Sequence, residues 1–252
     1  LPGEALGIAQ EEQRVDVATA RLEYYEYPAA LPTVELSSIK MDLYRRDFTI
    51  NALAVHLNPG HMGRLVDFFG AQKDIKDRVV RVLHSLSFVE DPTRILRAVR
   101  FEQRFGFRIG GQTLKLIKNA LKLQLFNRLS GNRIFNELKH ILEEEAPLAC
   151  LTRMQELHLL EAIHPRLKLN ASRTQVLMEL EKVLNWYRLL YLEPEASPWK
   201  VFLLGLTMGI DAEKMDQVAQ RLNLSQRDAR EFHTLREQIG EALGKLMNWR
   251  ED

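Results

Sequence analysis

The chain has 252 residues, 46% hydrophobic and 27% charged, a composition typical of a globular protein large enough for two or three small domains. Because 35 Lys and Arg residues nearly balance 34 Asp and Glu residues, the chain lacks the overall basic excess of many nucleic-acid-binding proteins, and any polyanion must be met by a local patch. The single cysteine excludes an intrachain disulfide framework and, with no apolar run near the ~18 residues of a membrane span, favours the cytoplasm.

The N-terminal part of the chain shows strand patterns. Residues 15–20 (VDVATA) alternate and are rich in β-formers, which predicts a strand with Asp16 between two buried valines. The tyrosine-rich segment EYYEYPAALPTVELSS is bounded by prolines and predicts an ordered loop.

Residues 42–57 (DLYRRDFTINALAVHL) predict a helix with an apolar face, in which Asp47 and Asn51 lie one turn apart on the same side. The next segment predicts a hairpin that turns at Asn58-Pro59-Gly60, and Gly70 precedes the following helix.

The segment EDPTRILRAVRF (90–101) predicts a helix with Asp91 at the N-cap and Pro92 at the first helical position. Its apolar residues fall on one side, and a row of arginines follows the other at helical spacing: Arg94, Arg97, Arg100 and Arg104. Taken alone, this stretch is equally consistent with a capped, salt-bridged surface helix.

After Phe107 amphipathic helical patterns continue to the end of the chain, with a capping-box start at Ser225 and breaks at Pro165 and Pro198. The sequence therefore predicts an α+β protein, with a β-containing piece up to about residue 70 and an all-helical remainder. The histidines show no metal-binding spacing, so the candidate chemistry lies with Asp16, with RRD (45–47) and Asn51, and with the arginine-rich helix.

Four segments carry these residues: RRDFTINALA, VDFFGAQKDIKDRVVR, EDPTRILRAVRF and SGNRIFNELKHIL. In order and spacing they resemble the head and neck of the class II tRNA nucleotidyltransferase and bacterial poly(A) polymerase family, over roughly residues 13–145. In the last segment Arg133 and Glu137 match the family's motif, while Asn132 stands where the family usually has glutamate.

The resemblance implies a domain plan and an activity. Residues 1–70 would be the C-terminal part of a nucleotidyltransferase head with a small mixed β-sheet, residues 71–130 a neck with a base-reading helix, and residues 131–252 a helical body and tail that bind tRNA. The activity would be template-independent addition of C and/or A to the tRNA 3′ end, from CTP and/or ATP with Mg2+.

The resemblance also implies how a nucleotide would be held. Cytosine and adenine both present an exocyclic amine beside a ring-nitrogen acceptor, so a carboxylate and a guanidinium would read both bases. In the family this pair corresponds to Asp91 and Arg94, and Asp47 would bind the ribose hydroxyls. The full set of nucleotide-binding candidates is Arg46, Asp47, Asn51, Asp91, Arg94, Arg97 and Arg100.

Structural alternatives remain open at each of these positions. Asp47 is also a possible N-cap, Asn51 a partner of the backbone, and Arg97 and Arg100 salt-bridge partners along the neck. Asp16 is either the polar face of a strand or the third carboxylate of the family's metal site.

The family's D-x-D metal-binding pair and GG-x-VRD segment are expected before residue 15, where this sequence has neither. The resemblance thus implies the C-terminal part of a longer enzyme, inefficient by itself, with Asp16 as its remaining catalytic and metal-binding candidate. A basic strip that would contact tRNA phosphates, or else form an ordinary solvated face, comprises Lys115, Lys118, Lys122 and Arg128.

Two other functions stay open: a poly(A) polymerase of the same family, and a non-catalytic RNA-binding helical module. The sequence does not separate CCA-, CC- and A-adding activity, and it leaves the oligomeric state open.

Overall fold

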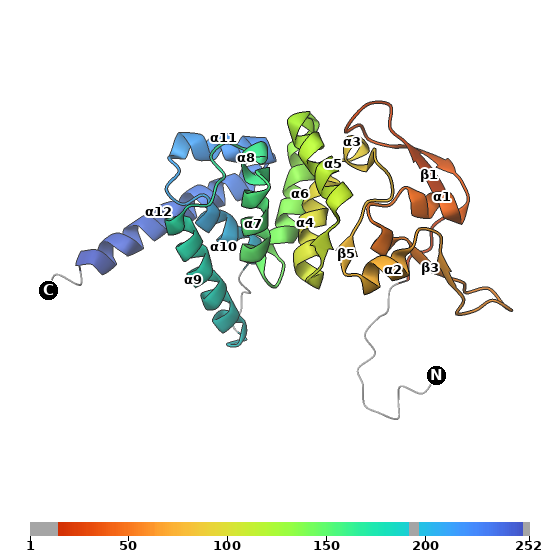
Figure 1. Cartoon of the computed structure of the whole chain (residues 1–252). Helices are drawn as coiled ribbons and strands as arrows, with labels where there is room; N and C mark the ends of the chain where they lie inside the picture. Colours follow the sequence, from red (N-terminus) through yellow and green to blue (C-terminus); the bar gives the residue numbers. More distant parts are fainter. Residues whose placement is uncertain (1–14, 192–196, 249–252) are drawn as a thin grey trace, which may run out of the picture.

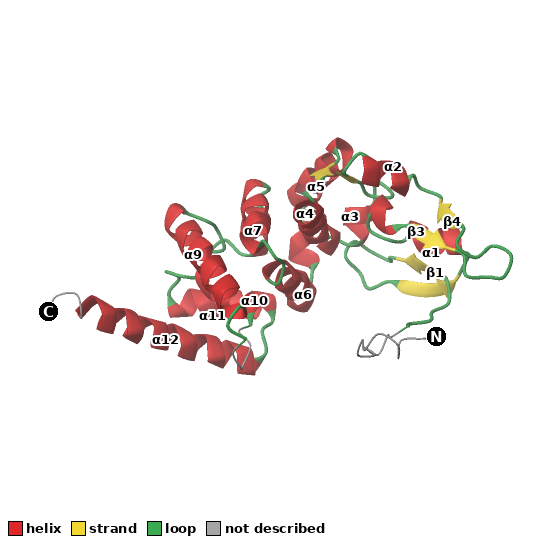
Figure 2. Cartoon of the chain, turned by 90° about the horizontal axis from the view of Figure 1, so that it is seen from below, coloured by secondary structure: helices red, strands yellow, loops and turns green. Residues whose placement is uncertain are grey.

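The computed structural model describes residues 15–191 and 197–248. Within them the strands gather at one end of an elongated molecule, and helices form its middle and its other end (Figures 1 and 2). This confirms the predicted α+β class. The strands form two antiparallel pairs and one parallel pair: β1 (Arg21–Tyr24) with β2 (Thr33–Leu36), β3 (Leu53–Val55) with β4 (Leu65–Asp67), and β5 (Val79–Val80) with β6 (Arg108–Ile109).

The strand predicted at residues 15–20 is wrong. These residues have no regular secondary structure, Asp16 is exposed, and the side chains expected to be buried, Val15 and Val17, are 81% and 94% exposed. The segment predicted as a loop instead supplies most of the β1–β2 hairpin, in which Arg21 pairs with Leu36. Alternation predicts a strand only where a partner strand and a covering face exist. Residues 21–24 and 33–36 are partner strands of each other, and the middle of β1 is partly covered.

The helix predicted over residues 42–57 is also wrong, because the chain breaks after α1 (Ile39–Tyr44) and forms only the short 3₁₀ turn η2 (Thr49–Asn51) before β3. At the break, Asp47 Oδ1 accepts the backbone N–H of Phe48 at 2.8 Å, a bond that competes with helix formation. Phe48 is fully buried and bridges to Val82, so packing favours the bend.

The hairpin and the glycine that follows it are confirmed. β3 and β4 pair across the loop that contains Asn58-Pro59-Gly60, and Gly70 is the N-cap of α2 (Ala71–Lys76) with φ +75°. A side chain at Gly70 would be strained in this left-handed conformation.

The helical part needs one correction, the parallel pair β5–β6, whose two-residue strands are too short to show an alternation. The predicted helical character is otherwise confirmed over the described residues, except that the segment 146–163 breaks at His158, whose φ is +58°; Ser225 accepts the N–H of Asp228, and Pro198 opens a helix. The helices and the remaining 3₁₀ turn are α3 (Ser87–Glu90), α4 (Thr93–Phe105), α5 (Gly111–Lys122), η3 (Leu125–Arg128), α6 (Gly131–Leu142), α7 (Pro147–Glu156), α8 (Leu159–Ile163), α9 (Ala171–Arg188), α10 (Pro198–Leu206), α11 (Ala212–Leu222) and α12 (Gln226–Asn248).

Helix α4 lies at the centre of the molecule, between the strand-containing end and the helical end (Figure 1). Its apolar residues from Ile95 to Phe101 are buried, the helix packs against α6 and α7, and one continuous core extends from there through α9, α10 and α11. Across residues 15–191 and 197–248, none of the helices has the length and apolarity needed to cross a bilayer.

Candidate nucleotide site

An open pocket of about 440 Å³ lies where the N-terminal half of α4 meets the strand-containing end. All nucleotide-binding candidates except Arg100 line this pocket. Its lining residues are Glu23, Tyr25, Arg45, Arg46, Asp47, Asn51, Asp91, Arg94, Arg97 and Phe101.

Asp91 lies just before α4, and its two carboxylate oxygens differ in environment. Oδ1 accepts hydrogen bonds from the backbone N–H and the hydroxyl of Thr93, and from Nη2 of Arg133 at 2.9 Å. The helix begins at Thr93, one residue later than expected, and its N-cap is Pro92 and not the predicted Asp91, although the Asp91 side chain does accept the Thr93 N–H. In the described part of the chain Oδ2 has no hydrogen-bond donor, so it is the oxygen available to a ligand.

Arg94 is only 5% exposed, and its guanidinium is held from several directions. Nη1 donates to Ser87 Oγ at 2.8 Å, and Nη2 donates to the carbonyl oxygen of Arg45 at 2.8 Å and to the Tyr25 hydroxyl at 3.5 Å. The carboxylate of Glu90 lies 3.7 Å from Nη1. The pocket wall therefore contains a positively charged guanidinium group whose orientation is fixed.

The positive charge of Arg94 affects the pKa values of neighbouring side chains. Burial, reinforced by the Arg94 charge, lowers the pKa of His84 to about 4, so His84 is neutral near pH 7. Burial raises the pKa of Glu90 despite the nearby Arg94. The positive charge of Arg94 thus has a partly buried carboxyl and a neutral imidazole beside it.

Asp47 contacts two other residues of the predicted set, Arg97 and Asn51. Its Oδ2 accepts a hydrogen bond from Arg97 Nε at 2.7 Å and lies 2.6 Å from Arg97 Nη2 in an ion pair, and its Oδ1 accepts a hydrogen bond from the Asn51 amide at 2.9 Å. Arg97 also reaches Glu137 at 3.3 Å. Burial lowers the pKa of Arg97, but the Asp47 and Glu137 carboxylates more than offset this and raise it.

Three pocket residues were missed by the sequence reasoning, Glu23, Tyr25 and Phe101, and Arg45 was included only as part of RRD, with no role assigned. The Tyr25 hydroxyl donates to Glu23 Oε2 at 3.0 Å, and Glu23 Oε1 accepts from Arg45 at 2.8 Å. Burial raises the pKa of Tyr25 to about 12. Only Arg45 had a signal, as the first residue of RRD, because the position of Tyr25 depends on how the β1–β2 loop folds back.

Comparison with known proteins places this chain in a family. The family model described as "Poly A polymerase head domain" matches residues 3–81, and "Probable RNA and SrmB- binding site of polymerase A" matches residues 106–170. Two A-adding tRNA nucleotidyltransferases are similar: that of Geobacter sulfurreducens is 48% identical over 99% of this chain, and that of Aquifex aeolicus is 42% identical over 80%. The chain belongs to the class II tRNA nucleotidyltransferase and poly(A) polymerase family.

Solved structures of the family have the same fold. A CCA-adding enzyme in an apo form aligns with a TM-score of 0.81 and 41% identity over 94% of this chain and 55% of that one. A complex of a CCA-adding enzyme with CTP aligns with a TM-score of 0.71 and 40% identity over 84% of this chain and 50% of that one. The chain spans 29% of the length of the Geobacter relative and 24% of the Aquifex relative.

Arg100 lies behind the pocket of this nucleotidyltransferase-family chain. It is buried, its guanidinium lies 5.0 Å from the centre of the Phe101 ring, and it forms ion pairs with Glu137 at 3.5 Å and Glu144 at 3.6 Å. The structure therefore shows the salt-bridge alternative for Arg100. For Arg97 it shows both, an ion pair and a place in the pocket wall.

The described residues do not fit a magnesium site. Within residues 15–191 and 197–248, no three His, Cys, Asp or Glu side chains gather closely enough to hold a metal ion, and Asp16 lies exposed outside any strand. The role of Asp16 as a catalytic and metal-binding residue stays a prediction.

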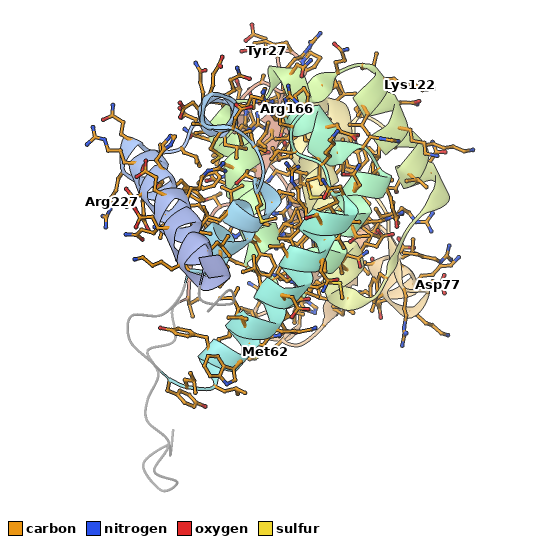
Figure 3. All side chains as sticks on the ribbon, turned by 90° about the vertical axis from the view of Figure 1, so that its left-hand side faces the viewer. Tyr27, Met62, Asp77, Lys122, Arg166 and Arg227 are labelled. Atoms are coloured by element: carbon orange, nitrogen blue, oxygen red, sulfur yellow. The ribbon has the colours of Figure 1, made fainter. Side chains whose placement is uncertain are left out.

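The basic strip is exposed along its whole length. Lys115, Lys118 and Lys122 follow one face of α5 at helical spacing, and Arg128 lies on η3. Figure 3 shows Lys122 at the periphery of the molecule. These cations are thus accessible to a polyanion, although exposure is equally a property of a solvated face.

Proposed function

We propose that this chain reads the nucleotide in an enzyme that adds adenosine, from ATP, to the 3′ end of tRNA. The observation that carries the proposal is the pair at the start of α4, a buried guanidinium fixed beside a carboxylate with one unoccupied oxygen. The names of the relatives with 48% and 42% identity favour A-adding over CCA-adding activity.

In this proposal Asp91 Oδ2 accepts the exocyclic amine of the base and Arg94 donates to the neighbouring ring nitrogen. Uracil and guanine present a carbonyl and an N–H on that edge. The carbonyl would face the Asp91 carboxylate and the N–H would face the Arg94 guanidinium, so neither hydrogen bond could form. Cytosine satisfies the same pair, so selection of ATP over CTP requires contacts beyond it.

The remaining pocket residues would hold the rest of the nucleotide. Asp47 would accept hydrogen bonds from the ribose hydroxyls, with Asn51 orienting its carboxylate. Arg46, which is more exposed than Arg97, and Arg97 would bind the triphosphate. The proposal includes Mg2+ as cofactor and the cytoplasm as location. We derive no step through the metal, since the described residues do not assemble its site.

The proposed domain plan assigns the head to residues 1–70, the neck to residues 71–130 and the tRNA-binding body and tail to residues 131–252. It is supported by the position of α4, which lies between the strand-containing and the helical ends (Figure 1).

The activity is tested by supplying three tRNA transcripts, ending at the discriminator base, at C and at CC, to the natural protein that carries this sequence. An A-adding enzyme extends only the CC-ended transcript, by one adenosine and only with ATP. Extension of all three with CTP and ATP would instead identify CCA addition, and a long adenosine tail on unrelated RNA would identify a poly(A) polymerase. RNA binding without any extension would overturn the enzymatic proposal in favour of a non-catalytic module.

We also propose that the basic strip of Lys115, Lys118, Lys122 and Arg128 binds tRNA phosphates. Changing Lys115 and Lys118 to glutamate is then expected to weaken tRNA binding about tenfold and to reduce the salt dependence by about one to two phosphate contacts. The measurement is the dissociation constant over a series of salt concentrations. The matched control changes Lys73 and Lys76, both exposed on α2, to glutamate. Equal losses in both variants would show only a general charge effect.

A further inference from the structure

Arg133 does not line the pocket, but it contacts one lining residue, Asp91, and the loop that carries another, Tyr25. It projects from α6, and its Nη2 donates to Asp91 Oδ1 at 2.9 Å while its Nη1 donates to the carbonyl oxygen of Ala29 at 2.7 Å. These partners lie 42 and 104 residues away in the sequence, just before α4 and on the β1–β2 loop. One guanidinium therefore joins three separate parts of the chain beside the pocket.

At Asp91 the contact is one of three that engage the same carboxylate oxygen. A carboxylate has two equivalent oxygens and rotates readily about its last side-chain bond. Two donors from Thr93 and one from Arg133 all converge on Oδ1, which leaves Oδ2 without a donor among the described residues. Arg133 is the only charged member of this set of donors.

At Ala29 the contact holds the loop that also contacts Arg94, the other proposed base-reading residue. Ala29 is buried and has φ +65°, a backbone conformation that a residue with a Cβ rarely adopts. Its N–H donates to Val89 at 3.1 Å and its carbonyl accepts from Arg133, so both backbone groups are fixed. The same loop carries Tyr25, whose hydroxyl accepts a hydrogen bond from Arg94.

We propose that Arg133 is a positioning residue for base specificity, a role that rests on the proposed function. It aims Asp91 Oδ2 into the pocket and, through the Ala29 loop, supports the Tyr25 contact to Arg94. Lysine is not expected to replace it fully, since its three donors radiate from one nitrogen, whereas the Arg133 guanidinium uses two separate nitrogens of a rigid fork.

The test measures the binding of ATP, GTP and inorganic tripolyphosphate to the 252-residue chain. The wild-type chain is expected to prefer ATP to GTP, and Arg133→Met is expected to reduce this preference about tenfold, because a misdirected carboxylate loses one base contact. Tripolyphosphate affinity is expected to stay unchanged, since Arg133 does not touch the phosphate-binding candidates. Arg133→Lys is expected to lie between wild type and Arg133→Met.

The control is Arg104→Met. Arg104, on α4, also forms an ion pair with another part of the chain, with Glu144 just beyond α6. This ion pair lies at the end of α4 away from the pocket, so its loss should preserve the ATP preference. A wild-type chain that binds ATP and GTP equally would overturn the proposed function itself. If the wild-type chain prefers ATP and Arg133→Met keeps the same preference, only the role of Arg133 is overturned. The same holds if Arg133→Met loses tripolyphosphate affinity in the same proportion as ATP affinity. If Arg133→Met does not fold, Arg133→Lys and Arg133→Gln are judged by the same ratio.

Discussion

Arg94→Met is expected to reduce the preference for ATP over GTP by about ten- to a hundredfold, the discrimination carried by a two-point base contact. The variant keeps the Asp91 acceptor but removes the donor to the ring nitrogen and the positive charge that opposes an N–H at that position. The measurement is the ratio of kcat/KM for ATP and GTP with a CC-ended tRNA, in the natural protein that carries this sequence.

The matched control is Arg100→Met, on the same helix. Arg100 is as buried as Arg94, but its guanidinium is ion-paired with Glu137 and Glu144 behind the pocket. Removing one partner from this buried network is expected to cost about 3–5 kcal/mol of stability, while the ATP preference stays unchanged. If Arg100→Met relaxes selectivity as much as Arg94→Met, the assignment of base reading to Arg94 fails.

Gly131→Ala is expected to destabilise the chain by about 1–3 kcal/mol through overpacking. Gly131 opens α6 against the end of α11, and an added Cβ would lie 2.5 Å from the carbonyl oxygen of Arg221 and 2.8 Å from the backbone nitrogen of Asn223. Both obstacles are backbone atoms, so α6 itself must move. Because α6 carries Arg133 and Glu137, the displacement should also weaken their contacts to Asp91 and Arg97.

The expected result is a lower denaturant midpoint with an unchanged slope. Gly111→Ala is the control, because Gly111 opens α5 in the same way but has no atom within 4 Å of an added Cβ. That variant is expected to be neutral or more stable by about 0.4–1 kcal/mol. Wild-type stability in Gly131→Ala would show that the junction between α6 and α11 is looser than its geometry implies.

The sequence predicted best what depends on near neighbours along the chain. The helices from α5 onward follow from apolar spacing, the cap at Ser225 from its hydroxyl, and the turn before α2 from Gly70. Each signal is complete within about one helical turn, so it needs no knowledge of distant residues. The predicted contact between Asp47 and Asn51 is present at 2.9 Å, although a bend and not a helix brings the two together.

The two wrong elements depended on burial instead. Val15 and Val17 alternate as in a strand, yet both lie exposed. The helical pattern over residues 42–57 gives way at Phe48, whose fully buried ring packs at 5.8 Å edge-to-face on Phe101. Periodicity states which residues share a face, but it does not state whether that face is covered.

By itself the sequence determined the family, the α+β class and the choice of Asp91, Arg94, Asp47 and Arg97 as candidate nucleotide ligands, because these follow from motif order and spacing. Only the tertiary structure decided how they meet. Asp47 and Arg97 lie 50 residues apart, Tyr25 and Arg94 lie 69 apart, and Arg100 on the same row turns away from the pocket. The sequence also cannot distinguish the two oxygens of Asp91, because Oδ1 is engaged by Arg133 from α6 as well as by Thr93.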